Sequence, residues 1–384
     1  HVWDTDGKKY LDLTAAFAVA ATGHANPRVT KAAQAQLAKL PHAMGDVHPH
    51  PLKGQLAREL SKLTFERWKR GRGKTIFCNS GFEAVEAALK TALLATGKKG
   101  VIAFEGAYHG LGYGALAATH REHFRNPFKK QLSKFGHFAP FPITAKELAE
   151  TETQLKALFK KHPIGAMLVE PIQGRAGLRV PPAKFLRMLR SLCDQHDALL
   201  IYDEIYTGFG RTGEWFACEH SSSFPDLICL GKALTNGFPL SACVGRATVM
   251  DRAWPKSTGE AIHTSTFLGH PVGCAMALAQ LRELKGKKLI TQARQRGKQL
   301  EKLCKRFPIR GARFVGKGLM AGLAFDESEG PRVFAVVKDM LRRGYILLPA
   351  GERGNVIALT PAFTISEKQL DQTLRALQSS FAKL

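Results

Sequence analysis

The chain has 384 residues, of which 45% are hydrophobic and 23% are charged. This length and composition predict two or three domains with a large buried core, and they exclude a disordered chain and a disulfide-dense miniprotein. Lysine and arginine outnumber aspartate and glutamate by 56 to 32, which gives a formal net charge of +24. That charge favours anionic partners, but the basic pairs are scattered along the chain. The pattern therefore indicates a solvated basic surface and argues against nucleic acid as a partner.

The sequence shows neither a membrane span nor a metal-binding pattern. The apolar run nearest to a span is 15–21, well below the roughly 18 residues that a membrane helix needs. The seven cysteines form no CxxC pair, so we expect neither a disulfide framework nor a zinc site. We expect a cytoplasmic protein without a metal. Because the chain begins at His1 rather than at methionine, we also expect preceding residues, with a targeting peptide among the candidates.

The middle of the chain alternates short apolar runs with amphipathic stretches. In chain order, these predict strands at 75–78, 101–104, 164–169, 198–202, 227–230 and 241–245, and helices at 81–96, 146–161 and 182–196. Buried strands that alternate with helices indicate βαβ units, a mostly parallel sheet and therefore an α/β fold. Ligands bind such sheets beyond the carboxyl ends of the strands, here just after Cys78, Phe104, Val169 and Tyr202.

The last third of the chain has a different pattern. It predicts a smaller α+β unit built from 319–325, 332–343, 345–348, 356–360 and 366–384, joined by the strand-like segment 8–13. A helix near 270–284 would connect the two parts. We therefore expect a large domain at 41–285 and a small domain built from both termini, 1–40 and 286–384.

The first candidate site is the segment Asn-Ser-Gly-Phe-Glu at 79–83, between a predicted strand and a predicted helix. A helix N-terminus presents unpaired N–H groups and a partial positive charge, which suit a phosphate. The same segment is also consistent with an ordinary helix start, in which Ser80 and Glu83 form a capping box. On its own, this segment leaves both interpretations open.

Three further features follow other predicted strands. Tyr108, in Tyr-His-Gly at 108–110, could stack on a flat ring or simply pack in a loop. Asp203 ends an apolar strand, where it needs a cation such as a protonated ring nitrogen or a salt-bridge partner. Lys232 follows a short apolar strand, where burial would make it a Schiff-base nucleophile, although a lone lysine is usually a surface charge. Together with the phosphate-binding candidate, these are the parts needed to hold pyridoxal 5'-phosphate (PLP).

These motifs carry a resemblance to a known family. From Val-Trp-Asp-Thr-Asp-Gly at 2–7 and Gly-His-Ala-Asn-Pro at 23–27 to the C-terminal helix, the chain resembles the class III (omega) aminotransferases of PLP fold type I. The most specific matches are the stretch from 203–213 through Lys232 to Pro239, and His-Thr-Ser-Thr-Phe at 263–267. The resemblance implies a seven-stranded, mostly parallel sheet flanked by helices, a smaller α+β domain and a homodimer with shared active sites.

The resemblance also implies a role for each matching residue. Lys232 would form the Schiff base with PLP and carry the proton, while Asp203 would pair with the pyridine nitrogen. Ser265 and Thr266 would reach the phosphate from the second subunit. The catalytic set is thus Lys232, Asp203 and Glu170, and the cofactor-binding set adds Ser80, Gly81, Phe82, Tyr108, His109, Ile205, Tyr206, Ser265 and Thr266.

The substrate side departs from the family pattern. Leu111 and Ala358 stand where many members have an arginine that contacts a substrate carboxylate, and Tyr206 stands where many have glutamine. Arg175 replaces an acid after Glu-Pro-Ile-Gln-Gly. One hypothesis is that Arg175 is a relocated carboxylate-binding residue, and the alternative is a surface arginine. Because Ala358 cannot bind a carboxylate, we expect poor use of 2-oxoglutarate.

The leading interpretation is a PLP-dependent transaminase that moves an amino group from an ω-amine or amino acid to a keto acid. A 7,8-diaminopelargonate synthase-like transaminase and a class III decarboxylase or amino-acid epimerase stay open, because they share the same cofactor apparatus. A non-enzyme alternative is a basic nucleic-acid-binding protein on an inactive scaffold. The presence of both Lys232 and Asp203 argues against that alternative.

Overall fold

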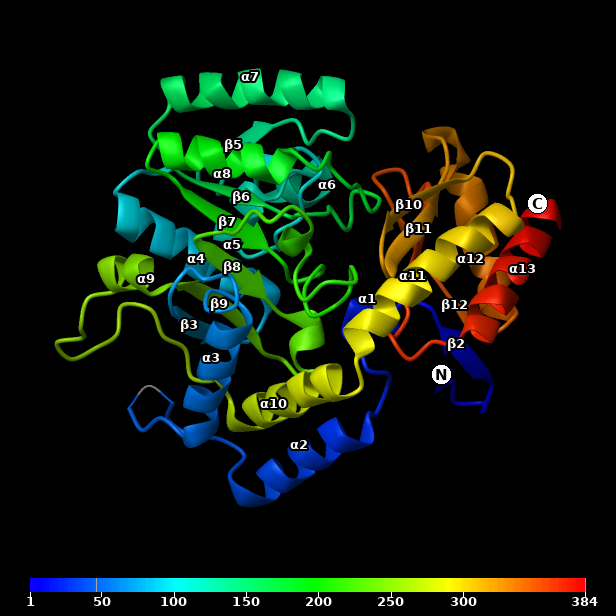
Figure 1. The fold of residues 1–384 in the computed structure, drawn as a ribbon, viewed down its shortest axis with the longest axis horizontal. Helices are drawn as coiled ribbons and strands as arrows, with labels where there is room; N and C mark the ends of the chain where they lie inside the picture. The colour runs from blue at the N-terminus through cyan, green and yellow to red at the C-terminus, as the bar shows by residue number, and fades with distance from the viewer. Residues whose placement is uncertain (46, 384) are drawn as a thin grey trace.

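The computed structural model describes residues 1–45 and 47–383 of the chain. Its largest sheet has seven strands in the order β3-β9-β8-β7-β6-β4-β5 (Figure 1). Neighbouring strands run parallel except along β9, which is antiparallel to both of its neighbours. This arrangement confirms the predicted α/β class and the mostly parallel seven-stranded sheet. No helix in the described part of the chain is both long and apolar enough to span a bilayer.

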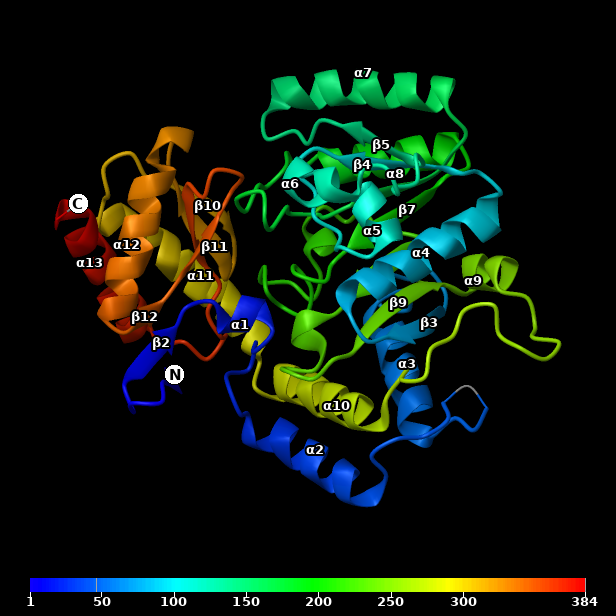
Figure 2. The ribbon, with the colours of Figure 1, turned by 180° about the vertical axis from the view of Figure 1, so that it is seen from behind.

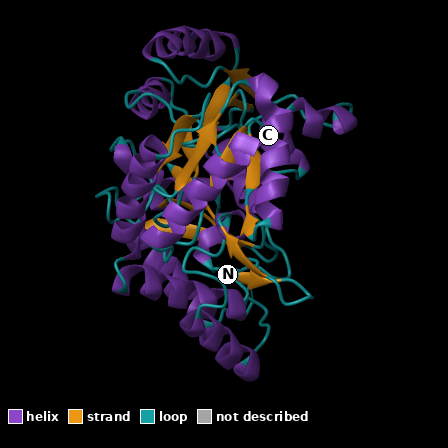
Figure 3. Ribbon diagram, turned by 90° about the vertical axis from the view of Figure 1, so that its right-hand side faces the viewer, coloured by secondary structure: helices purple, strands orange, loops and turns teal. Residues whose placement is uncertain are grey.

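Helices lie on both sides of this sheet, so the strands are enclosed between two layers (Figure 3). The strands are β3 (Gly73–Cys78), β4 (Gly100–Phe104), β5 (Gly136–Ala139), β6 (Ile164–Val169), β7 (Leu199–Asp203), β8 (Leu227–Leu230) and β9 (Ser241–Arg246). The helices of this part are α2 (Pro27–Lys39), α3 (Pro51–Leu63), α4 (Gly81–Thr96), α5 (Tyr113–Ala118), α6 (Glu122–Arg125), α7 (Ala145–Lys161), α8 (Phe185–Gln195), α9 (Ala247–Ala253) and α10 (Pro271–Gly286).

The period of two along each strand divides the core between the two faces. In β6, whose six residues are all buried, Leu168 joins the core cluster that includes Ala84 and Ala88 of α4. Its neighbour Met167 points to the other face and joins the cluster that includes Phe185 of α8. Successive strand residues point to opposite faces, so a strand covered on both sides must be apolar throughout. This requirement explains why β6 and β8 were predicted with their observed bounds.

The smaller part of the molecule contains two further sheets. One has the order β1-β2-β12 and the other β10-β11-β14-β13, with α11, α12 and α13 beside them (Figure 1). Their bounds are β1 (Val2–Trp3), β2 (Lys9–Asp12), β10 (Arg313–Lys317), β11 (Met320–Ala324), β12 (Tyr345–Ile346), β13 (Leu348–Ala350), β14 (Val356–Leu359), α11 (Leu289–Arg306), α12 (Gly330–Arg342) and α13 (Glu367–Lys383). The short α1 (Ala15–Ala18) follows β2.

Two predicted elements were wrong in detail. The segment 345–348 is not one strand, because β12 pairs in parallel with β2 while β13 pairs with β14 in the other small sheet. The predicted helix 182–196 begins only at Phe185, after the two prolines Pro181 and Pro182. Strands β5 and β10 were missed because they are partly exposed and lack a continuous apolar run.

The division into domains stays a proposal, and the position of helix α2 favours a boundary earlier than the predicted one at residue 41. Residues of β1 and β2 belong to the small sheets, as expected for a unit built from both termini. Helix α2, however, packs along α10 beneath the seven-stranded sheet, and the front and rear views agree on this position (Figures 1 and 2). We therefore propose that α2 belongs with the large domain, although it precedes residue 41.

Candidate active site

A cavity of about 650 Å³ opens at the carboxyl ends of the parallel strands, between the large sheet and the small sheets. Ten of the predicted site residues line it, namely Gly81, Phe82, Tyr108, His109, Glu170, Arg175, Asp203, Ile205, Tyr206 and Lys232. They come from segments far apart in the sequence that follow β3, β4, β6, β7 and β8. The position agrees with the rule that open α/β sheets bind ligands beyond their strand ends.

Lys232 lies two residues beyond β8, in a short 3₁₀ turn, and its side chain faces this cavity. Its Nζ lies 4.9 Å from the centre of the Tyr206 ring. Burial lowers the pKa of the Lys232 amine, and the nearby carboxylates of Asp203 and Glu170 oppose this change. A desolvated amine gives up its proton more readily, as a nucleophile or proton carrier must.

The lowered pKa leads to a stability prediction for the cofactor-free protein. The Lys232 amine has a lower pKa in the folded chain than in the unfolded chain. Protonation of this amine therefore favours the unfolded state and lowers the free energy of unfolding at neutral pH. The effect disappears above about pH 10.4, where the amine is deprotonated in both states. We expect Lys232→Met to raise the free energy of unfolding near neutral pH and to have a smaller effect at about pH 10. Urea denaturation at both pH values measures this, with the exposed Lys160→Met as control. Equal effects at the two pH values would contradict it.

Asp203 is the last residue of β7, and its carboxylate is only 5% exposed. Its Oδ1 accepts a hydrogen bond from the N–H of Ile205 at 3.1 Å, and its Oδ2 lies 2.9 Å from Nδ1 of His109. Because an ionised carboxylate can only accept, His109 donates from Nδ1. Nε2 of His109 is buried and has no hydrogen-bond partner among the described residues. Asp203 is thus held in one orientation at the cavity wall.

The neighbouring acid, Glu204, has a different environment. It points away from the cavity and accepts hydrogen bonds from the backbone N–H groups of Ala217 (2.9 Å) and Cys218 (2.8 Å). Burial raises the pKa of Glu204 to about 7. The two adjacent carboxylates therefore have different roles. Glu204 holds the segment at Ala217 and Cys218 in place, whereas Asp203 faces the cavity.

Glu170, just beyond β6, links two loops of the cavity wall. Its Oε1 accepts from the N–H of Tyr108 at 3.0 Å, and its Oε2 accepts from the N–H of Gly174 at 2.9 Å. Burial raises the pKa of Glu170 to about 7, and the charge of Asp203 contributes in the same direction. The geometry makes Glu170 a positioning residue for Tyr108 as well as a lining group.

The start of α4 has the features of a phosphate site. The Glu83 carboxylate accepts from the N–H groups of Asn79 (2.7 Å) and Ser80 (2.8 Å). Gly81 and Phe82, the first two helical residues, line the cavity, and their N–H groups have no intrahelical acceptor. The capping box expected from the sequence is present, with the Ser80 hydroxyl facing the N–H of Glu83, but the buried hydroxyl makes no hydrogen bond of normal geometry. A buried hydroxyl without a well-formed hydrogen bond, beside the unpaired N–H groups of a helix start, fits an anionic ligand such as a phosphate.

A glycine allows the Tyr108 loop to approach this helix start. Gly110 has a φ of +112°, and a Cβ at this position would lie 2.3 Å from the Cβ of Phe82. No residue other than glycine fits without displacing one of the two segments. The stacking candidate and the phosphate candidate are therefore brought together by backbone contact.

Three predicted cofactor residues do not line the cavity: Ser80, which is half-buried at the start of α4, and Ser265 and Thr266. Ser265 and Thr266 are exposed on the surface of the chain. Their predicted role is to contact the phosphate in the other subunit of a dimer. This role stays a prediction.

Several lining residues were missed by the sequence interpretation. Thr14, Phe17, Arg121, Thr360 and the segment 348–351 also line the cavity, most of them from the small part of the molecule. None belongs to a motif, and only the tertiary fold brings them to the site. All four predicted departures line the cavity, and two of them, Leu111 and Ala358, present no charge to it.

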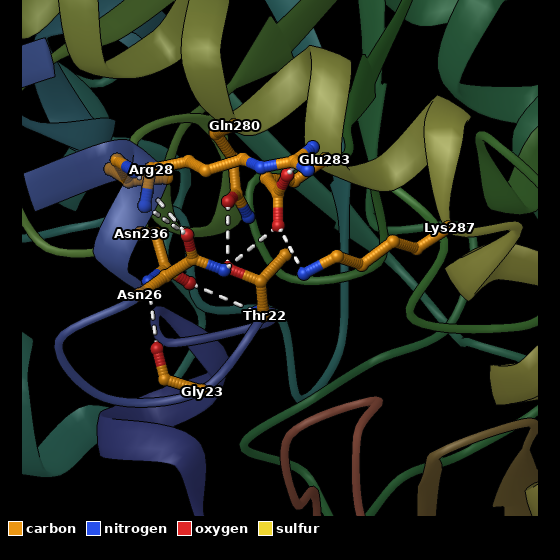
Figure 4. Close-up of polar contacts among 9 residues, drawn as sticks. Thr22, Gly23, Asn26, Arg28, Asn236, Gln280, Glu283 and Lys287 are labelled. Carbon is orange, nitrogen blue, oxygen red and sulfur yellow. Dashed lines mark hydrogen bonds and ion pairs between the residues drawn. The ribbon is translucent and has the colours of Figure 1, made fainter. Parts of the chain in front are cut away.

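A hydrogen-bond network fixes the loop that follows Lys232 (Figure 4). Asn236 accepts from the N–H of Thr22 at 3.0 Å and donates to the carbonyl of Gly23 at 2.9 Å. Gln280 of α10 donates to the carbonyl of Ala233 at 3.3 Å and accepts from the Thr22 hydroxyl at 2.9 Å. The loop is thereby tied to α10 and to the N-terminal segment.

The same network continues through a buried carboxylate on α10. Glu283 forms ion pairs with Arg28 (2.9 Å) and Lys287 (2.6 Å) and accepts from the Asn26 amide at 3.2 Å (Figure 4). Asn26 also begins α2 by accepting from backbone N–H groups. Two cations and an amide satisfy this acid, as a buried carboxylate requires. The Gly-His-Ala-Asn-Pro segment at 23–27 thus contacts both the loop after Lys232, through Gly23, and helix α10, through Asn26.

Arg211 fastens the large part of the molecule to the small part. Its buried guanidinium donates to the carbonyls of Leu319 (3.1 Å) and Pro361 (2.6 Å) and lies 4.6 Å from the centre of the Phe363 ring. Burial lowers the pKa of Arg211 to about 10. Arg211 does not line the cavity, and its contacts assign it a structural role.

Comparison with known proteins gives a consistent result. The model of the family named aminotransferase class-III matches residues 1–381. The chain belongs to the class III aminotransferase family. It is 37% identical over 376 residues to the acetylornithine aminotransferase of Methanopyrus kandleri, and the match covers 98% of this chain and 90% of that protein.

Two solved structures resemble this class III aminotransferase over nearly its whole length. One is an amine transaminase from an uncultivated Pseudomonas species in the PLP-bound (internal aldimine) form, with 29% identity and a TM-score of 0.88, covering 99% of this chain and 92% of that one. The other is the ornithine aminotransferase of Toxoplasma gondii, with 29% identity and a TM-score of 0.87, covering 100% and 88%. The class III aminotransferase is therefore a transaminase enzyme of PLP-dependent chemistry. The non-enzyme alternative is set aside.

Proposed function

We propose that this aminotransferase holds PLP in the 650 Å³ cavity, with Lys232 as the residue that binds it covalently and Asp203 as the partner of its ring nitrogen. One observation carries the proposal. The amine of Lys232 and the carboxylate of Asp203 line the same cavity, from the ends of the adjacent strands β8 and β7. The proposed reaction moves an amino group from an ω-amine or amino acid to a keto acid.

The surrounding residues fit this group. The start of α4, where the N–H groups of Gly81 and Phe82 have no intrahelical acceptor, is suited to the phosphate. Tyr108 and Ile205 supply apolar surface for the faces of a flat ring. When bound, PLP supplies an electron sink for the reacting carbon of the substrate.

The chain's own groups would handle the proton. The Asp203 carboxylate, held by His109 and Ile205, favours the charged form of a facing ring nitrogen and so keeps a proton there. Lys232 has a lowered pKa and faces the ligand space, so its amine can accept a proton from a substrate carbon and return it. Glu170 fixes the Tyr108 loop through its two backbone contacts.

Assembly and compartment belong to the same proposal. The exposed Ser265 and Thr266 support a homodimer in which each chain completes the partner chain's phosphate site. All seven cysteines are free, and six of them are buried, which supports a reducing compartment such as the cytoplasm.

The proposed substrates follow from the charges at the cavity. Leu111 and Ala358 offer nothing to bind a second carboxylate, so a dicarboxylate acceptor would leave one charge unpaired. The Methanopyrus kandleri relative is named for acetylornithine, an ornithine derivative whose α-amine is acylated and whose side-chain amine is free, which supports amino acids with an ω-amine as donors. Because the reported relatives are aminotransferases, we retain transamination over epimerisation or decarboxylation.

The test is a donor and acceptor screen of the PLP-loaded protein. Ornithine, N-acetylornithine and 5-aminopentanoate serve as donors, with pyruvate or 2-oxoglutarate as acceptor, and the amino product is quantified. We expect transfer to pyruvate to exceed transfer to 2-oxoglutarate. A protein that gains no visible absorption with PLP and transfers no amino group from any donor would contradict the proposal.

A further inference from the structure

We infer that Arg121 and Arg175 together bind the carboxylate of the substrate, an inference that rests on the proposed function. Both side chains line the cavity, although Arg121 precedes α6 and Arg175 lies in the loop beyond β6. Only Arg175 stands out in the sequence. The folded chain places a second guanidinium at the same cavity.

One aromatic cluster orients both arginines. The guanidinium carbon of Arg121 lies 5.4 Å from the centre of the Phe124 ring, and that of Arg175 lies 5.5 Å from the same ring. Arg175 also lies 4.7 Å from the centre of the Tyr108 ring, which packs edge-on against Phe124. A guanidinium stacked on a ring keeps its N–H edge free for hydrogen bonds in its own plane.

These N–H groups are not used by the protein's own carboxylates. Within the described part of the chain, no carboxylate forms an ion pair with Arg121 or Arg175. The one side-chain hydrogen bond of Arg121 goes to the backbone carbonyl of Glu352 at 3.4 Å, and its buried Nε has no partner there. Two uncompensated cations beside an enclosed space attract an anion, and paired N–H donors match a carboxylate.

The rest of the described cavity wall leaves this role to the two arginines. Lys232 is assigned to the reacting amine or carbonyl, and His109 is bonded to Asp203. Leu111 and Ala358 are apolar. A keto acid acceptor nevertheless brings a carboxylate into the cavity, where an unpaired charge would be costly. The arginine pair accounts for that charge.

Both arginine segments are also fastened to the small part of the molecule. The N–H of Gly351 donates to the carbonyl of Arg175 at 3.1 Å, and Arg121 reaches Glu352 of the same loop. Strand β13 and Gly351 after it line the cavity opposite the large sheet. The site is therefore held from both sides, which fixes the guanidinium positions before a ligand enters.

Arg121→Gln and Arg175→Gln test the pair, with substrates that differ in one carboxylate. We compare 5-aminopentanoate with pentylamine, and alanine with isopropylamine, in the PLP-loaded enzyme. For at least one pair, each variant should raise KM for the carboxylate substrate about 10- to 100-fold, because hydrogen bonds to a charged group are lost. KM for the matching amine should stay unchanged. Binding of pentanoate to the cofactor-free protein, followed by ligand-observed NMR, should weaken by about 10-fold or more.

Arg125→Gln is the matched control, because it removes one positive charge from the same segment. Its guanidinium stacks on Phe138 at 4.7 Å and does not line the cavity. The inference would be contradicted if KM changed equally for carboxylate and amine substrates in the Arg121 and Arg175 variants. It would also be contradicted if the wild type and all variants bound pentanoate equally well. An inactive wild type that still binds pentanoate through these arginines would instead contradict the proposed function alone.

Discussion

Lys232→Ala should abolish amino transfer, with a fall in kcat of roughly 10⁴-fold or more, and should remove the visible absorption of the PLP-loaded protein. Two losses combine in this variant. With the roles proposed for Lys232, the cofactor would lose its covalent attachment, and the substrate carbon would lose the group that carries its proton. The side chain lies at the cavity surface rather than in the core, so the fold should persist.

The measurement is single-turnover kinetics with 5-aminopentanoate, together with an absorption spectrum and circular dichroism. The exposed Lys160→Ala controls for removal of a lysine. Added methylamine should partly restore proton transfer in Lys232→Ala, because it supplies the missing amine, and it should do nothing for the control. A spectrum like that of the wild type in Lys232→Ala would assign the covalent attachment to another residue.

Asp203→Asn should retain part of its bound PLP and lose about 10²-fold or more in kcat. In the proposed site the carboxylate would keep a proton on the facing ring nitrogen, and a neutral amide would not. Asparagine has the same shape, and its amide oxygen can still accept one of the two hydrogen bonds that now come from Ile205 and His109. The expected loss is therefore mainly electrostatic.

Spectral titration with PLP measures retention of the cofactor, and stopped-flow absorption measures the rate. Asp194→Asn, an exposed acid at the end of α8, controls for loss of a negative charge. A near-normal rate in Asp203→Asn would show that the ring nitrogen meets a different group.

The sequence predicted the elements whose burial pattern is unambiguous. Strand β6 is apolar at every position because both of its faces are covered. Helix α4 runs from Gly81 to Thr96, between the capping residue Ser80 and Gly97, whose φ is +69°. Strands β5 and β10 have no such signal. The split of 345–348 between two sheets depends on pairing with distant strands, which local pattern does not encode.

The candidate site divides in the same way. Tyr108, Asp203 and Lys232 follow strands, so their convergence follows from the geometry of a parallel sheet. Arg121 follows the short helix α5 and precedes α6, where an arginine is ordinarily a surface charge. Its place at the cavity depends on the packing of Phe124 against Tyr108. Ser265 and Thr266 could be interpreted only through the family, because their proposed target belongs to another chain.

The backbone at Lys232 adopts a φ of +41°, a conformation that suits glycine far better than a residue with a long side chain. Burial of its amine is a second, independent penalty at the same residue. A chain optimised for folding alone would place glycine here. The contacts of Asn236 and Gln280 around this loop supply the compensation that makes lysine tolerable. Asn236 and Gln280 therefore contribute to the reactivity of Lys232, although neither side chain lines the cavity.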